Sequence, residues 1–213
     1  MSIAEKKPIS SQEEQMFWQA IDVSNSKKQA SWDAYDIDEH LENLVKYLAQ
    51  FEKNQLISFE RVLQQKLAQL YTAEIAELSI IMECEFSKDE AGYNFDVYVS
   101  DDGFIYFRCW LILKGKEFFD DIQSDIQNFV SGKYSFDIGN CWAEGLLYVT
   151  DEAYSIAHDN EDEAEVRDAV GEQYPENDYD GGDYEMQRDI YAGNALHKTY
   201  PRLVEEICEL RVS

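Results

Sequence analysis

Residues 104–113 constrain the fold most, because these ten consecutive positions contain a single charged side chain. They read Phe-Ile-Tyr-Phe-Arg-Cys-Trp-Leu-Ile-Leu, and Arg108 is the only charge among them. A helix that is apolar on nearly every face belongs inside a fold, with other helices packed around it. We therefore predict a mainly α fold, a compact multi-helix domain built around a buried central helix at about residues 101–114.

The ends of this helix carry capping signals. Ser100 can accept a hydrogen bond from a backbone N–H of the first turn, and Asp101 and Asp102 follow where the helix dipole favours carboxylates. A buried Arg108 would need a partner, since an unpaired buried charge is very costly. The candidate partners are Asp101, Glu83 and Glu144. We favour capping and one buried ion pair over a ligand site on Asp101, Asp102 and Arg108, because neither role needs a substrate.

The same stretch resembles the signature of a bacterial family known as domain of unknown function 4240. The matching residues are Ser100-Asp101-Asp102-Gly103-Phe104, Tyr106-Phe107-Arg108, Trp110-Leu111-Ile112 and Gly115. Weaker flanking matches are Phe17-Trp18, Ile21-Asp22, Phe59-Glu60, Tyr148-Val149, Ala153-Tyr154 and Pro201-Arg202-Leu203. The chain departs from the family pattern by an insertion at residues 84–99 and by a longer acidic segment after His158. The resemblance implies a mostly helical intracellular bacterial protein and supplies no catalytic residue.

Apolar residues at three-and-four spacing predict further helices on both sides of the central one. The expected ranges are 11–26, 36–51, 58–71, 72–82, 118–130, 140–154, 161–169, 190–196 and 201–210. Ser11 with Glu14 fits a capping box for the first helix, and Pro201 suits the first position of the last one. Alternating apolar and polar residues on either side of Gly92 predict a short β-hairpin or an ordered loop within residues 84–99.

Length and composition favour one cytoplasmic domain. The 213 residues fit a single helical domain at 1–213, within which residues 159–189 form an acidic, loop-rich segment. No apolar run approaches the twenty residues of a membrane span, and residues 1–8 lack the apolar core of a signal peptide. The four cysteines contain no Cys-x-x-Cys pair, which suits a reducing compartment.

The charge restricts the classes of partner. Forty-four acidic residues against eighteen basic ones give a formal net charge of −26. Nucleic-acid phosphates and anionic membranes both require a basic face, so neither is an expected partner. A strongly acidic protein instead associates rapidly with a basic protein through electrostatic steering.

The acidic segment at 159–189 is the candidate docking surface, because it contains thirteen acids and only two bases, Arg167 and Arg188. Interleaved tyrosines would add large contact areas at low entropic cost. The predicted partner-binding residues are Glu161, Asp162, Glu163, Asp178, Tyr179, Asp180, Asp183, Tyr184 and Glu185. A solvated loop explains the same composition equally well.

No catalytic, cofactor or metal motif stands out. His40, His158 and His197 are isolated and are expected on the surface. The acids around Asp180 do not follow the ligand spacing of a calcium loop. We therefore expect neither an enzyme nor a bound cofactor or metal.

The expected function is that of a protein that binds and neutralises a basic partner, such as an immunity protein against a bacterial toxin or effector. The first alternative is an enzyme or small-ligand binder with a pocket at Asp101, Asp102 and Arg108. The second alternative is a nucleic-acid mimic with regularly spaced acids.

Overall fold

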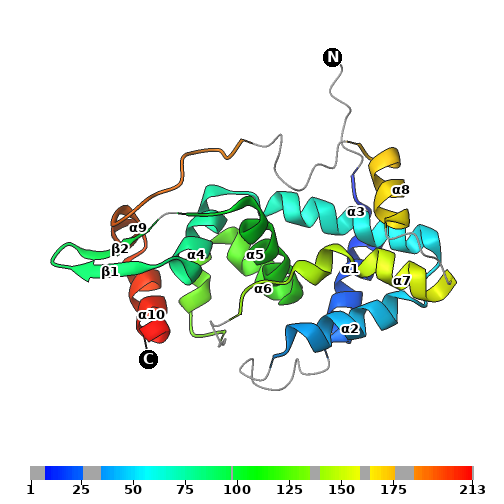
Figure 1. Ribbon diagram of the computed structural model, residues 1–213, viewed down its shortest axis with the longest axis horizontal. Helices are drawn as coiled ribbons and strands as arrows, with labels where there is room; N and C mark the ends of the chain where they lie inside the picture. Colours follow the sequence, from blue (N-terminus) through cyan, green and yellow to red (C-terminus); the bar gives the residue numbers. More distant parts are fainter. Residues whose placement is uncertain are drawn as a thin grey trace, which may run out of the picture. The chain divides into compact units, whose positions relative to one another are not determined.

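The chain folds into helices and a β-hairpin (Figure 1), and contact clustering divides it into two units. The computed structural model describes residues 8–25, 35–96, 98–134, 140–158, 164–175 and 185–212. Unit 1 comprises Met1–Gln69 with Ala143–Asp183, and unit 2 comprises Leu70–Trp142 with Tyr184–Ser213. The expectation of a single helical domain stays a prediction.

Unit 1 is a bundle in which three early helices pack against two later ones. Its elements are α1 (Ser11–Ser24), α2 (Ile37–Leu48), α3 (Lys53–Gln69), the 3₁₀ turn η3 (Glu144–Leu147), α7 (Val149–His158) and α8 (Glu165–Gln173). Helix α1 packs on α2 and α3, α7 lies against α2 and α3, and α8 lies against α3 and α7. Fully buried Phe17 and Phe59 join α1 to α3, with ring centroids 4.7 Å apart.

The first helix begins one residue earlier than the predicted capping box. Ser10, not Ser11, is the N-cap, and its hydroxyl accepts from the Glu13 backbone N–H at 3.2 Å. The Glu13 carboxylate returns the contact by accepting from the Ser10 N–H. Glu14 is left to pair with Lys66 of α3 at 2.5 Å. Both serines have a glutamate three residues on, so the sequence allows either box.

His40 contradicts the expected surface position, because it is 2% exposed between α1 and α2. One ring nitrogen lies 2.9 Å from the Ile21 carbonyl oxygen and 3.0 Å from the Ser24 hydroxyl. The other lies 2.8 Å from the Tyr35 hydroxyl. These contacts satisfy the buried imidazole and give it a structural role.

A buried polar cluster joins α3 to α7 through Glu60, which is 2% exposed. Its carboxylate accepts hydrogen bonds from Gln64 and from the Thr150 hydroxyl, each at 2.9 Å. Burial raises the pKa of Glu60 from 4.5 to about 7, although these two donors oppose the shift. The folded protein therefore holds a proton on Glu60 at pH values where the unfolded chain has released it.

This proton makes stability depend on pH, and Glu60→Gln should remove that dependence. The contribution of Glu60 to the free energy of unfolding is fully present below about pH 4.5 and is lost as the pH rises through about 7. The free energy of unfolding at low pH exceeds that at high pH by about 3 kcal/mol from this group. We expect Glu60→Gln to unfold at higher denaturant than wild type at about pH 8, and the difference to shrink at about pH 5. Urea unfolding at both pH values measures it. The exposed Glu42→Gln should show no such trend, and an unchanged pH profile for Glu60→Gln would refute the prediction.

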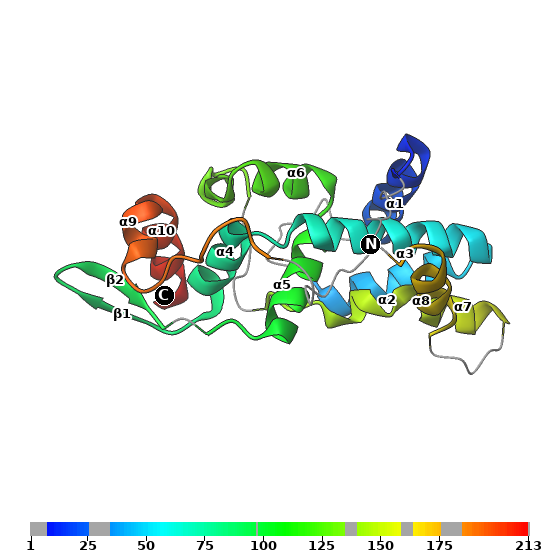
Figure 2. The same ribbon diagram turned by 90° about the horizontal axis from the view of Figure 1, so that it is seen from above.

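Unit 2 contains α5 between α4 and α6, with the hairpin beside the last two helices (Figure 2). Its elements are α4 (Ala73–Glu83), β1 (Phe86–Asp89), β2 (Gly92–Phe95), α5 (Asp101–Leu113), α6 (Lys116–Ser124), the 3₁₀ turn η2 (Ile126–Val130), α9 (Ala195–Thr199) and α10 (Pro201–Val212). Helix α5 contacts α4 and α6, and α10 contacts α4, η2 and α9.

Helix α5 is the buried element that its sequence predicts. Every residue from Phe107 to Leu113 is buried, and Trp110 and Arg108 are among the largest fully enclosed side chains. Trp110 stacks with Phe107 and meets the rings of Phe118 and Phe129 from α6 and η2. The mainly α fold with a buried central helix is therefore confirmed.

The predicted hairpin is also confirmed. Strands β1 and β2 pair antiparallel, with Phe86 opposite Phe95 and Asp89 opposite Gly92. Gly92 has φ +108°, and a Cβ there would lie 2.1 Å from the imidazole of His197. His197 accepts from the Tyr93 backbone N–H at 3.1 Å. Glycine therefore allows both the turn and the contact with α9.

Two predicted helices are each divided in the structure. The range 118–130 breaks at Asp125, whose extended backbone ends α6 and whose carboxylate caps η2 through the Gln127 N–H at 2.9 Å. The range 140–154 begins as non-helical chain, so only η3 and α7 are helical and Trp142 lies before both. Side chains that compete for backbone groups stop a helix where apolar spacing alone would continue it.

Other helix boundaries also moved. Asn54 and Gln55, which precede the helix expected at 58–71, lie in the first turn of α3, where the Gln55 side chain accepts from the Glu52 N–H at 3.0 Å. The expected helix at 190–196 is replaced by α9, which starts at Ala195. The expected helix at 161–169 corresponds to α8, four residues later. Pro201 is the first residue of α10, as predicted.

A second buried acid, Glu77 of α4, anchors the chain that follows the acidic segment. Glu77 is fully buried, and the Arg188 guanidinium donates to its two oxygens at 2.5 and 2.8 Å. The Tyr191 N–H and the Tyr200 hydroxyl donate to the same carboxylate, each at 2.7 Å. Such a pair is tolerated in a core because the remaining lone pairs also receive donors.

In the part of the chain that the structure describes, no helix has both the length and the apolarity to cross a bilayer.

Candidate functional site

The predicted capping residues lie at the start of α5. Ser100 is the N-cap, and its hydroxyl accepts from the Gly103 N–H at 3.0 Å. Asp101 and Asp102 occupy the first turn and are exposed. A Cβ at position 103 would lie 2.8 Å from the Ser100 hydroxyl oxygen and 3.6 Å from the Trp142 ring. Glycine is required there by the close approach of the cap.

The burial of Arg108 bears on the alternative of a ligand site at Asp101, Asp102 and Arg108. Its side chain is 0% exposed, and its guanidinium lies over the rings of Phe104 and Tyr71, 4.7 and 5.1 Å from their centroids. Its Nε–H points at the Phe104 carbonyl oxygen at 3.4 Å. The alternative of a ligand site on Asp101, Asp102 and Arg108 therefore loses its main support, because core packing encloses the guanidinium, and a site on the two exposed aspartates stays a prediction. Glu144 is exposed and lies 3.5 Å from the Tyr148 hydroxyl, and its pairing with Arg108 stays a prediction.

Most of the predicted partner-binding residues lie outside the residues that the structure describes. These are Glu161, Asp162, Glu163, Asp178, Tyr179, Asp180, Asp183 and Tyr184. Glu185 is described and is exposed. The two bases of the acidic segment both bind buried acids, Arg188 at Glu77 and Arg167 at Asp151.

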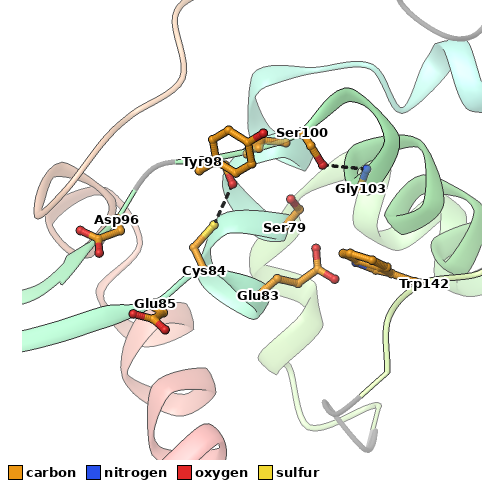
Figure 3. A pocket seen from close by; sticks show the side chains of 10 residues that line it. Ser79, Glu83, Cys84, Glu85, Asp96, Tyr98, Ser100, Gly103 and Trp142 are labelled. Carbon is orange, nitrogen blue, oxygen red and sulfur yellow. Dashed lines mark hydrogen bonds between the residues drawn. The ribbon is translucent and has the colours of Figure 1, made fainter.

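A pocket of about 380 Å³ lies within unit 2, and sequence reasoning did not find it (Figure 3). The end of α4, the base of the hairpin, the start of α5 and Trp142 form its walls. The lining residues are Ser79, Glu83, Cys84, Glu85, Asp96, Tyr98, Val99, Ser100, Gly103 and Trp142. Among these ten residues three are acidic and none is basic, so the pocket attracts cations.

Backbone contacts hold the base of the hairpin at this pocket. The Asp96 N–H donates to the Glu85 carbonyl at 2.9 Å, and the Cys84 thiol donates to the Tyr98 carbonyl at 3.4 Å. From α10, the Arg211 guanidinium donates to the carbonyls of Ile81 and Cys84 at 2.8 and 2.7 Å. These bonds satisfy the C-terminal end of α4 and keep the pocket walls in place.

Glu83 is the polar group at the inner side of the pocket, where Figure 3 shows its carboxylate directed toward Trp142. Burial raises the pKa of Glu83 to about 7, and a hydrogen bond from Trp142 and the charge of Arg211 oppose the shift. Burial likewise raises the pKa of the Cys84 thiol, so this cysteine is not an activated nucleophile. The arrangement suits binding better than nucleophilic chemistry.

The sequence contained only a weak signal for this site. The sequence offers Glu83 as one possible partner of Arg108 and places Trp142 within the helix expected at 140–154. In the structure Trp142 is 54% exposed and Tyr98 is 80% exposed. Only the three-dimensional arrangement of separate segments shows that Trp142, Tyr98 and Glu83 line the same pocket.

The fold and this pocket define a mainly α protein with an acidic, aromatic-lined pocket. Comparison of the sequence with protein-family models shows its family. The model of the family described as "Protein of unknown function (DUF4240)" matches residues 13–155, more than half of the chain. The chain therefore belongs to this family, which confirms the resemblance. Searches of curated proteins and of solved structures found no match. The pocket lies wholly within the matched range, whereas residues 159–189 lie beyond it.

Proposed function

We propose that this protein is a non-enzymatic binding protein whose acidic surface engages and neutralises a basic protein, as an immunity protein engages a toxin or effector in the bacterial cytoplasm. The observation that supports this most is the excess of acids, 44 against 18 bases. An excess of this size accelerates association with a basic partner and discourages acidic ones.

Many basic side chains of the described residues pair with acids of the same chain. Those that form ion pairs with carboxylates are Lys46, Lys53, Arg61, Lys66, Lys116, Lys133, Arg167, Arg188 and Arg202. Two of them, Arg61 and Lys66, are also nearly buried. Because much of the positive charge is neutralised within the fold, an approaching protein meets predominantly negative charge.

The proposed mechanism is steric. Exposed acids steer the basic partner, a few aromatic side chains anchor it, and the bound protein covers the partner's own functional site. Asp178, Asp180 and Asp183, between tyrosines in the acidic segment, are the acids we propose for the docking surface. The interaction should weaken as ionic strength rises, since salt screens exposed charges.

Affinity purification from the source bacterium at low and at physiological ionic strength tests this proposal. We expect one basic protein in near-stoichiometric amount, and suppression of that protein's own activity when purified protein is added back. The variant Asp178→Asn/Asp180→Asn/Asp183→Asn should bind it at least about tenfold more weakly at low salt.

The matched control is a triple variant that changes the net charge by the same amount outside the acidic segment. Glu42, Glu152 and Glu209 are exposed, and their triple replacement by Gln should leave binding within about threefold of wild type. If no basic protein is retained at low salt, or if the retained protein works equally well when bound, the proposed function is wrong.

A further inference from the structure

The pocket beside α5 combines the two features that a protein uses to bind a cation, carboxylates and exposed aromatic faces. Glu83, Glu85 and Asp96 line it from α4 and from the base of the hairpin. Glu85 and Asp96 are exposed, whereas Glu83 is partly buried. The pocket therefore offers a cation two solvated carboxylates and one partly desolvated carboxylate, where attraction is stronger.

The aromatic wall is independent of these carboxylates. Trp142 is 54% exposed and Tyr98 is 80% exposed, so two large rings contact water beside the pocket. Trp142 is held in place by an edge contact with Tyr106, with ring centroids 6.0 Å apart. An ordered, half-exposed tryptophan is the residue type most enriched where binding energy concentrates.

We propose that this pocket receives an arginine side chain of the basic partner protein. The inference rests on the proposed function for the source of the arginine. A guanidinium is planar, stacks on aromatic faces and donates to carboxylates in a fork, whereas a lysine ammonium is a compact point charge without this planar fork. The volume of about 380 Å³ admits a long side chain together with the backbone that presents it.

The protonation of Glu83 fits this occupant. Burial holds its pKa at about 7, so at about pH 7 part of the population is neutral. A guanidinium beside the carboxylate stabilises its ionised form and lowers that pKa. The other charged groups around Glu83 are Arg211 from α10 and the acids Glu85 and Asp96.

The first test needs no partner protein. The ¹⁵N-labelled full chain is titrated with a five-residue peptide that has one central arginine between glycines and blocked ends. We expect the Trp142 indole N–H and the Gly103 amide to shift in nuclear magnetic resonance spectra. The same peptide with citrulline, which has the shape of arginine without its charge, should bind at least about tenfold more weakly.

Two variants separate the pocket from the general acidity of the surface. Glu83→Gln keeps the shape of the side chain, and Trp142→Ala removes an exposed ring. Each should weaken arginine-peptide binding about tenfold, whereas the exposed Glu152→Gln, with the same loss of charge, should not. Thermal unfolding checks that each variant is folded. Shifts scattered over the surface without Trp142, or equal binding by Glu83→Gln, would overturn the proposal.

Free arginine distinguishes a docking pocket from a small-molecule site. If free arginine binds tighter than the peptide, the pocket takes a metabolite and the proposed occupant is wrong. Once a partner is purified, Trp142→Ala should weaken it about tenfold. Undiminished partner binding by this variant would refute the inference while leaving the proposed function standing. A failure to find any basic partner would refute the proposed function instead.

Discussion

Replacing Arg188 with methionine is expected to destabilise the protein by about 3 kcal/mol. The change leaves the fully buried carboxylate of Glu77 without its guanidinium partner, and removing one member of a buried pair typically costs about 3–5 kcal/mol. We expect the lower end of this range because the Tyr191 N–H and the Tyr200 hydroxyl still donate to Glu77. Urea unfolding monitored by circular dichroism measures the loss.

Two further variants test the reason for this loss. Lys116→Met removes an exposed cation from the same unit, where Lys116 pairs with Asp120, and should cost less than about 1 kcal/mol. The double variant Glu77→Gln/Arg188→Met removes the buried charge as well and should recover part of the stability. A single variant as stable as Lys116→Met would show that Arg188 does not stabilise Glu77.

Replacing Asp151 with alanine is expected to cost about 3 kcal/mol and to loosen α8 more than the rest of unit 1. Asp151 is 2% exposed, and one of its oxygens accepts from the backbone N–H groups of Val166 and Arg167 at 2.7 and 3.3 Å. The Arg167 side chain pairs with the same carboxylate. Asp151 on α7 thus caps α8 from a distance, because Ala164 at the N-cap has no side-chain oxygen.

Hydrogen exchange resolves this local effect. Amide protons of α8 should exchange faster in Asp151→Ala than in wild type, while those of α1 change less. The neighbouring Glu152→Ala is the matched control, because Glu152 is exposed. Asp151→Asn should fall between, since its amide oxygen can still cap α8 but cannot neutralise Arg167. Uniform acceleration across unit 1 would contradict a local capping role.

Local sequence determined the features whose causes lie within a few residues. Helix α5 was predictable because each of its faces is apolar and Ser100 supplies its cap. The hairpin was predictable from alternation around Gly92. The break at Asp125 was not, because the apolar stripe continues through it and only the competition of its carboxylate for the Gln127 N–H ends the helix.

Tertiary structure alone decided the features that join distant segments. Glu77 and Arg188 are 111 residues apart, and nothing in either neighbourhood predicts that one buries the other's charge. Trp142 resembled a core residue until its neighbours on α4 and α5 were placed, which left its ring half exposed beside Glu83. Capping and periodicity are short-range and can be read along the chain. Burial of a charge and the formation of a pocket depend on which distant segments pack together. No pattern of neighbouring residues in the sequence shows that packing.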